Sequence, residues 1–161
     1  MSIALSGSEL IEVAIGIEKR GIAFYDIMAK STDNEAARHN FQHLVVMERE
    51  HIQIFQDMLA ETDSWQATKS FGKEQAGYLQ ALIDRAVFTD DTATSEMAMC
   101  VDSDIQAMEL GISAEKDSML FYYQMRDIMP QQTHAMINKI IAEEKLHLAQ
   151  LSELKKQLTA S

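Results

Sequence analysis

The sequence has very little of the residues that interrupt or cross-link a chain. Among 161 residues there are one proline, six glycines and one cysteine, Cys100. So little proline and glycine favours long helices over many short elements joined by turns. A single cysteine excludes an internal disulfide and any cysteine-rich zinc or iron–sulfur motif, and a reducing, cytoplasmic setting is therefore expected.

Basic residues are also scarce. The chain has 14 lysines and arginines against 25 aspartates and glutamates, which gives a formal net charge of −11. This excess disfavours nucleic acid and anionic membranes as partners. The first residues have neither a basic start nor a long apolar run, and no stretch is long and uncharged enough to span a bilayer. The length predicts a single domain over 1–161.

Apolar residues recur with helical spacing in four long segments. Ser6–Glu9 and Thr32–Glu35 have the pattern of capping boxes, which predicts a helix after each of them. Pro130 occupies a position where the first turn of a helix tolerates proline. The four helices are expected over about 6–30, 32–61, 103–129 and 130–158. The sequence therefore predicts an all-α protein.

The segment between the second and third of these helices has a weaker pattern. Residues 62–73 show no sustained period and are interpreted as a loop, whereas 74–88 has the apolar spacing of a short helix. Residues 90–94 interrupt that pattern, and 95–100 is expected to add one helical turn. A connection of this length can run from one end of a bundle to the other.

Two of the long helices carry a Glu-x-x-His pair within their apolar stripe. Glu48 and His51 lie among apolar neighbours on the second helix, and Glu144 and His147 do so on the fourth. A carboxylate on a buried stripe is costly unless something pairs with it. Two such pairs make up half of a four-helix dimetal carboxylate site.

An internal repeat supplies the other half. The segment from Glu18 to Tyr25 aligns with the segment from Glu115 to Tyr122 at an offset of 115 − 18 = 97 residues, and the Glu-x-x-His pairs follow at 144 − 48 = 96. Each half of the chain is therefore predicted to be a helical hairpin with Glu on its first helix and Glu-x-x-His on its second. Both pairs of glutamates lie almost equally far from the turn of their hairpin, which places all four at one height in the bundle.

Four carboxylates and two imidazoles suit two divalent metal ions, with iron or manganese preferred to zinc. Four negative charges balance two doubly charged ions, so metal binding makes buried carboxylates tolerable. We expect Glu48 and Glu144 to bridge metals roughly 3.5–4 Å apart. The terminal ligands are then Glu18 and His51 on one metal, and Glu115 and His147 on the other.

Other polar and aromatic residues have simpler interpretations. Tyr25 and Tyr122 are expected to be core aromatics that can also hydrogen-bond a ligand carboxylate or act as redox neighbours. Cys100 is interpreted as an incidental small apolar residue. Three further histidines fall off the apolar stripes and are expected at the surface: His39, His43 and His134.

These motifs resemble the ferritin-like di-iron proteins, and most closely the rubrerythrin family. The phrases around Glu18–Tyr25 and Glu115–Tyr122 are similar to that family's first and third helices. The resemblance implies a ferritin-like four-helix bundle of two antiparallel hairpins, joined by a long crossover that contains a short extra helix. It also implies two iron ions, held by Glu18, Glu48, His51, Glu115, Glu144 and His147, that reduce hydrogen peroxide or O2.

The sequence departs from the family pattern in two ways. It has no Cys-x-x-Cys motif, so the electrons are expected to come from an external donor protein rather than from a rubredoxin-type module. Typical members also have an extra Glu one turn before the third-helix ligand, where this chain has Ile112. The symmetric six-ligand set is similar to the ferroxidase centre of bacterioferritin.

Three functions therefore remain open: a peroxide-reducing di-iron enzyme, a ferroxidase that oxidises Fe(II), and a metal-free helical interaction protein. Manganese or zinc could also replace iron. The apolar face at 79–86 could either cap the bundle or form a homodimer contact.

Overall fold

The computed structural model describes residues 6–61 and 73–160, and within them the chain is all-α, without a strand. Nearly all of the predicted 62–73 loop lies outside these residues. None of the described helices is both long and apolar enough to cross a membrane. The helices are α1 (Gly7–Ser31), α2 (Glu35–Glu61), α3 (Lys73–Asp84), α4 (Asp91–Met99), α5 (Asp104–Ile128) and α6 (His134–Ala160), with a 3₁₀ turn, η2 (Gln131–Thr133), before α6.

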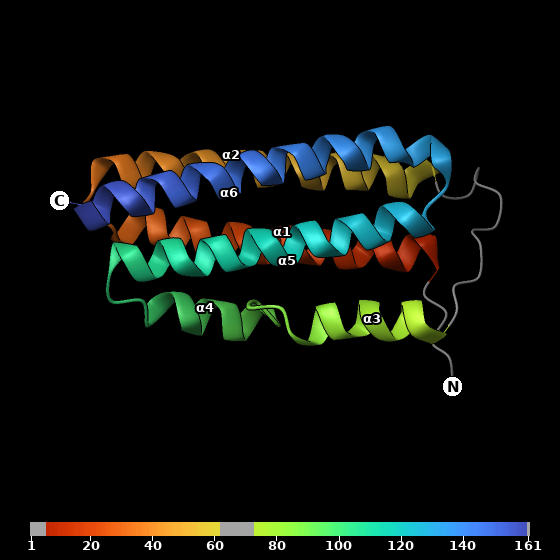
Figure 1. Ribbon diagram of the computed structural model, residues 1–161, viewed down its shortest axis with the longest axis horizontal. Coiled ribbons are helices and arrows are strands. Elements are labelled where there is room, and N and C mark those ends of the chain that lie inside the picture. Colours follow the sequence, from red (N-terminus) through yellow and green to blue (C-terminus); the bar gives the residue numbers. More distant parts are fainter. Residues whose placement is uncertain (1–5, 62–72, 161) are drawn as a thin grey trace.

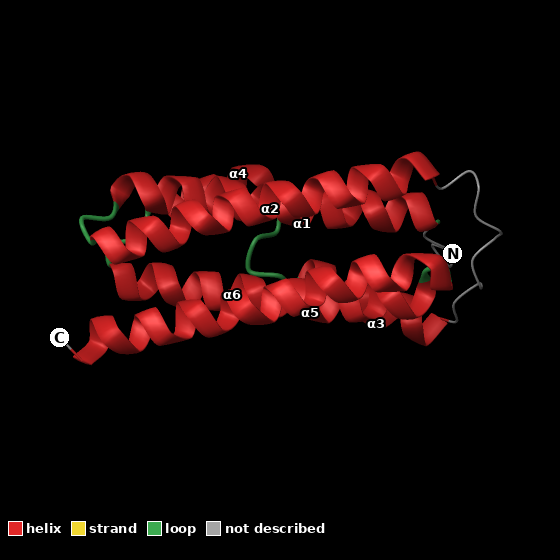
Figure 2. Ribbon diagram, turned by 90° about the horizontal axis from the view of Figure 1, so that it is seen from above, coloured by secondary structure: helices red, strands yellow, loops and turns green. Residues whose placement is uncertain are grey.

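The four long helices form a bundle of two antiparallel hairpins, α1–α2 and α5–α6, as expected (Figure 1). The crossover lies along the α1/α5 side of the bundle, away from α2 and α6 (Figure 1). Because α3 packs on α5 and α4 packs on α1, the segment that links them crosses from one hairpin to the other near the middle of the bundle (Figure 2). The crossover thus covers the mid-point of the α1/α5 face.

Helix α1 starts as predicted, but α2 does not. Ser6 forms the complete capping box with Glu9. Thr32 does not cap α2, because Asn34 accepts the hydrogen bond from the backbone N–H of Ala37 at 2.9 Å. Asparagine caps helices at least as well as threonine, and it stands next to the first helical residue. The Thr32 hydroxyl instead donates to Asp104 on α5 at 2.6 Å, which ties the two hairpins together.

The crossover differs from the prediction in two places, and the turn between α5 and α6 differs in one. Helix α3 ends at Asp84 rather than at residue 88. Asp90, expected to interrupt the helical pattern, instead caps α4 by accepting from the N–H of Ala93 at 2.7 Å. Pro130 precedes the 3₁₀ turn instead of lying in the first turn of α6. The crossover therefore contains two short helices, separated by an irregular segment at mid-bundle.

The bundle core consists of two apolar clusters with a polar layer between them. One cluster fills the end around Leu10, Met58 and Met125, and the other fills the end around Met28, Phe41 and Leu154. Burying these side chains stabilises each end by roughly 1.5–3 kcal/mol per large residue. The burial of apolar side chains at both ends offsets the free-energy cost of burying the charged layer between them.

Candidate metal centre

All six predicted ligands meet in the layer between the apolar clusters. None of these residues is more than 3 % exposed. Their atoms form two overlapping groups of four, within each of which the ligand atoms lie within 4.8 Å of one another, and Glu48 and Glu144 belong to both groups. The first group adds Glu18 and His51, and the second adds Glu115 and His147. This is the division between two positions that the repeat predicts.

Several atoms of the candidate ligands in this layer are buried without a hydrogen-bond partner. They are one oxygen of Glu115, both oxygens of Glu144 and Nδ1 of His147. The His147 Nδ1 atom lies 3.5–3.7 Å from oxygens of Glu48, Glu115 and Glu144. Leaving a buried polar atom unpaired costs roughly 1–3 kcal/mol. Four convergent carboxylates and two imidazoles with such atoms fit a pair of divalent cations.

Both imidazoles point Nδ1 toward the carboxylates. Nδ1 of His51 lies 3.0 Å from Glu144 Oε1 and 3.1 Å from Glu48 Oε2. Its Nε2 lies 2.8 Å from Oε2 of Glu143, a residue that the sequence analysis missed. With the proton on Nε2, the ring donates to Glu143 and turns its Nδ1 lone pair inward, as a metal ligand requires. The available signal was the second carboxylate in the Glu-Glu-x-x-His sequence of α6.

The surroundings of His147 are different. The ring of the exposed His43 packs edge-on against His147, with 6.3 Å between ring centroids. His43 was expected at the surface and is exposed, but its contact with a buried ligand candidate was not foreseen. The contact of His43 with His147 depends on how α2 and α6 pack against each other. The spacing of residues along α2 alone does not predict that packing.

Each of the two buried tyrosines reaches across to the opposite hairpin. Tyr25 on α1 donates to Oε1 of Glu115 on α5 at 2.6 Å, and Tyr122 on α5 donates to Oε1 of Glu18 on α1. Burial, together with the nearby carboxylates, raises the pKa of both phenols well above the usual value. The tyrosines therefore stay protonated and hold the two outer carboxylates in place.

The carboxylates and imidazoles strongly shift one another's pKa values. Burial, and then repulsion from neighbouring carboxylates, raises the pKa of Glu48 and Glu144 well above the usual range. Burial by itself would raise the pKa of Glu18, but hydrogen bonds within the cluster outweigh it and lower that pKa. Burial would lower the pKa of His51 and His147, but the surrounding carboxylates raise both. Protons bound to the cluster thus offset the negative charge of its carboxylates, as bound cations would.

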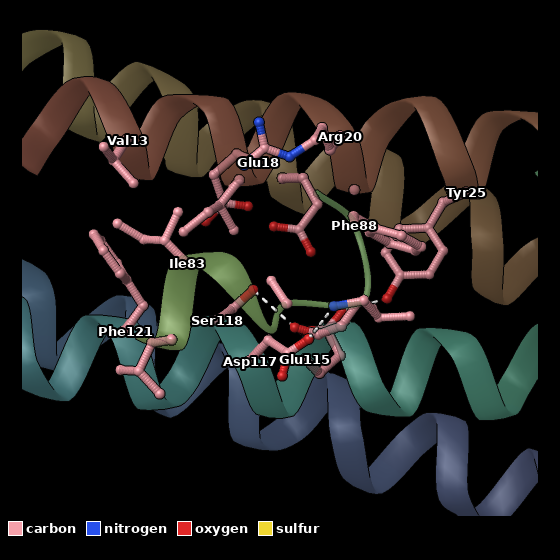
Figure 3. A pocket seen from close by; sticks show the side chains of 17 residues that line it. Val13, Glu18, Arg20, Tyr25, Ile83, Phe88, Glu115, Asp117, Ser118 and Phe121 are labelled. Atoms are coloured by element: carbon pink, nitrogen blue, oxygen red, sulfur yellow. Dashed lines mark hydrogen bonds between the residues drawn. The ribbon is translucent and has the colours of Figure 1, made fainter. Parts of the chain in front are cut away.

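A small chamber adjoins this cluster on the α1/α5 side (Figure 3). Glu18, Glu48 and Glu115 line it, and so does Tyr25, whereas neither histidine of the cluster does. Its volume open to the centres of water-sized molecules is about 40 Å³. The remaining walls are mostly apolar and come from α1, α5 and the crossover. The cluster is thus reached from the side that lies opposite its imidazoles.

Comparison with known proteins agrees with this geometry. The rubrerythrin family model matches residues 9–155. The chain belongs to the rubrerythrin family. A crystal structure described as a ferritin-like diiron-carboxylate protein from Thermotoga maritima is 30% identical to it, with a TM-score of 0.69 over 95% of this chain and 96% of that one. No curated protein matches the chain.

Membership in the rubrerythrin family confirms the ferritin-like fold that the motifs implied. Rubrerythrin-family proteins of the di-iron type are generally oxidoreductases, and the buried Glu/His cluster gives this member a possible dimetal site. The family and the donor set together define the chemistry from which a function can be argued.

Proposed function

We propose that this protein is a di-iron oxidoreductase that reduces hydrogen peroxide, with electrons from an external donor protein. The observation that carries the proposal is the pair of overlapping ligand groups, which share Glu48 and Glu144 and contain one imidazole each. Carboxylate-rich sites with one imidazole per metal suit iron in its ferrous and ferric states. Glu48 and Glu144, which belong to both groups, would serve both metal positions. Glu18 and His51 would complete one position, and Glu115 and His147 the other.

The reaction consumes two electrons and two protons for each peroxide, which becomes two molecules of water. Two iron ions held by the cluster would supply these electrons, and the donor protein would restore them. The chain's own residues fix the positions and limit access. Tyr25 and Tyr122 hold the outer carboxylates, and Glu143 orients His51. The chamber admits a small oxidant to the carboxylate side while its apolar walls restrict water.

A ferroxidase is the second candidate, and one observation favours it. Ile112, at the position where typical rubrerythrins have an extra ligand, lines a groove with Ser152 and Lys155 on α6 and not the buried cluster. The candidate ligand set is therefore the symmetric six-residue set, which also suits a centre that takes Fe(II) as its substrate.

The deciding experiment is an anaerobic Fe(II) titration, followed by rapid mixing with H2O2 or O2 while the near-ultraviolet absorption of the ferric product is recorded. Saturation at two irons per chain, with faster oxidation by peroxide than by O2, is the expected result. Continued oxidation of added Fe(II) beyond two per chain would favour the ferroxidase. Absence of saturable binding would contradict both and leave a metal-free bundle.

A further inference from the structure

We propose that metal ions enter the buried cluster through the chamber on the α1/α5 side, and that Arg20 is the gate at the mouth of this chamber. This route rests on the dimetal site of the proposed function and does not depend on the reaction with peroxide. Figure 3 shows Glu18 and Arg20 on α1, and Glu115 and Asp117 on α5, on opposite sides of the chamber. None of the six candidate ligands is more than 3 % exposed, so an ion needs an opening to reach them.

The charges that line the chamber favour a cation. Of its five charged lining residues four are acidic, and Arg20 is the exception. Oε2 of Glu115 is buried without a hydrogen-bond partner, in a residue that is only 2 % exposed. A cleft lined mainly by one sign of charge attracts ions of the opposite sign and speeds their arrival. The partly open chamber therefore gives a divalent cation a favourable path to the cluster.

The α2/α6 side of the cluster is covered by the two imidazoles and their neighbours. Nε2 of His51 lies 2.8 Å from Glu143, and the exposed ring of His43 packs edge-on against His147. An ion that arrived from this side would have to displace an imidazole that is itself a candidate ligand. The carboxylate side requires no such displacement, because neither histidine lines the chamber.

Arg20 lies between the chamber and the surface. It lines the chamber and also a hollow beside the crossover, which Asp90 and Asp91 line as well. Carboxylates are therefore present on both sides of Arg20, in the outer hollow and in the inner chamber. A cation that follows this path meets a single positive charge, and it meets that charge at the mouth of the chamber.

The side chain of Arg20 has room to move. A Cβ atom built at Gly16 would lie 3.3 Å from Nη1 of Arg20, closer than ordinary van der Waals contact, so the guanidinium rests against this glycine one turn earlier on α1. The Nε atom of Arg20 is buried and has no hydrogen-bond partner. A swing of the guanidinium toward Asp90 and Asp91 would thus break no hydrogen bond at Nε, and it would clear the path to the chamber.

The first test follows the uptake of Co(II) by the metal-free protein, recorded by visible absorption after rapid mixing. Arg20→Gln should speed uptake about threefold or more at low salt, because one opposing charge is removed from the path. Arg20→Lys keeps that charge and should take up Co(II) at the wild-type rate. Lys139→Gln is the matched control: it removes a positive charge on the α2/α6 side, 4.0 Å from Glu143, and should leave the rate unchanged.

Asp117→Asn tests the same path with the opposite sign of charge. Oδ2 of Asp117 accepts the N–H of Val87 at 2.8 Å, and the amide oxygen of asparagine can accept the same hydrogen bond, so the contact stays while the charge disappears. Uptake should become slower by a similar factor. Asp127→Asn, on an exposed part of α5, removes the same charge away from the chamber and should have no effect. The effects of the Arg20 and Asp117 variants should shrink as NaCl is added, because salt screens charges near the surface.

Release of the metal distinguishes a gate from a charge that acts only on the bound ion. With excess EDTA, Arg20→Gln should also lose Co(II) faster than the wild type, because a gate raises the barrier in both directions. Faster uptake together with slower release would mean that Arg20 only repels the bound ion, and would overturn the inference.

The remaining outcomes separate the entry route from the proposed function. Equal changes of the uptake rate in Arg20→Gln and Lys139→Gln, or no change in either, would overturn the route and leave the dimetal site intact. Absence of saturable Co(II) binding would overturn the proposed function, and the route with it. A protein that takes up two ions at rates set by Arg20 but does not reduce peroxide would contradict the proposed reaction alone.

Discussion

The two hairpins supply the same ligand types from equivalent positions, yet they surround them differently. His51 of the first hairpin has a carboxylate partner, Glu143, at 2.8 Å on its outer nitrogen. The residue equivalent to Glu143 in the first hairpin is Met47, since 143 − 96 = 47, and it cannot serve His147 in the same way. His147 has the ring of His43 beside it instead.

The opposite side of the cluster is asymmetric too. Arg20 and Asp117 are equivalent, since 117 − 97 = 20, and both line the chamber. Of the two, only Asp117 makes a hydrogen bond to the described part of the crossover, residues 73–103. A carboxylate that accepts from a ligand imidazole fixes the ring and raises its basicity. The comparison therefore teaches that the repeat sets the candidate ligands, while their neighbours give the two candidate metal positions different surroundings. We expect the His51 position to bind metal more tightly.

The largest expected effect comes from deleting one outer carboxylate. Glu115→Ala should reduce metal binding from two ions to one and lower the stability of the metal-loaded protein, since the second group loses a ligand. Glu18→Ala should do the same to the first group. The measurement is metal stoichiometry by calorimetry with Fe(II) or Co(II), together with thermal unfolding.

If the protein is instead a metal-free interaction protein, the opposite change in stability is expected. In that case Glu115→Ala stabilises the fold by roughly 1–3 kcal/mol, because a buried carboxylate with one unpaired oxygen disappears, and added metal changes nothing. A variant that melts above the wild type both with and without Fe(II) would contradict the dimetal site.

A change at Glu143 should have the next largest effect. Glu143→Gln should weaken metal binding at the His51 position by about 10–100-fold and bring the two affinities together, because a carboxylate partner is lost. Met47→Glu should strengthen the His147 position by offering its ring the missing partner. Stepwise titration with Co(II), followed by visible absorption, measures both. Two indistinguishable steps in the wild-type protein would contradict the inequivalence.

The pH dependence of the metal-free protein is expected to be smaller but clear. Glu48, Glu144, His51 and His147 have raised pKa values in the folded state, so the folded protein binds more protons than the unfolded chain above the ordinary values of 4.5 and 6.5. Their stabilising contribution is complete below those values and is lost as the pH rises. The melting temperature of the metal-free protein should therefore fall by several degrees between about pH 5 and pH 8.

Metal-loaded protein is the control for this dependence. Bound cations replace the protons, so the melting temperature of the loaded protein should change much less over the same range. The double variant Glu48→Gln, Glu144→Gln should also flatten the dependence of the metal-free protein. A melting temperature that rises with pH in the metal-free wild type would show that the cluster does not hold these protons.

The smallest effects are expected from the two tyrosines, which also test the symmetry most directly. Tyr25→Phe and Tyr122→Phe each remove one hydrogen bond to an outer carboxylate, worth about 1.5–3 kcal/mol when the acceptor is charged and less when metal holds the same carboxylate. If the hairpins are equivalent here, the two variants lose equal stability in chemical denaturation. Unequal losses would extend the inequivalence to the outer carboxylates.

The sequence was sufficient for the fold and for the six candidate ligands because both leave periodic signals. The spacing of apolar residues predicts amphipathic helices, and a Glu or His within such an apolar stripe is easily recognised. The offset between Glu18 and Glu115 adds a second, independent signal. The residue that caps a helix was harder to predict from the sequence. Thr32 and Asn34 are both good capping residues and lie close together, and the hydrogen bond of Thr32 to Asp104 selected between them.

What the sequence determined by itself is the part of the site that lies on helix faces, since the position of a residue on a regular helix follows from its number. Only the tertiary structure decided what lies between helices. The partnership of Glu143 with His51, the contact of His43 with His147 and the Asp117 hydrogen bond to Val87 each join segments at least 30 residues apart. No local period encodes such contacts, because they depend on how whole helices pack and where the crossover passes over the bundle.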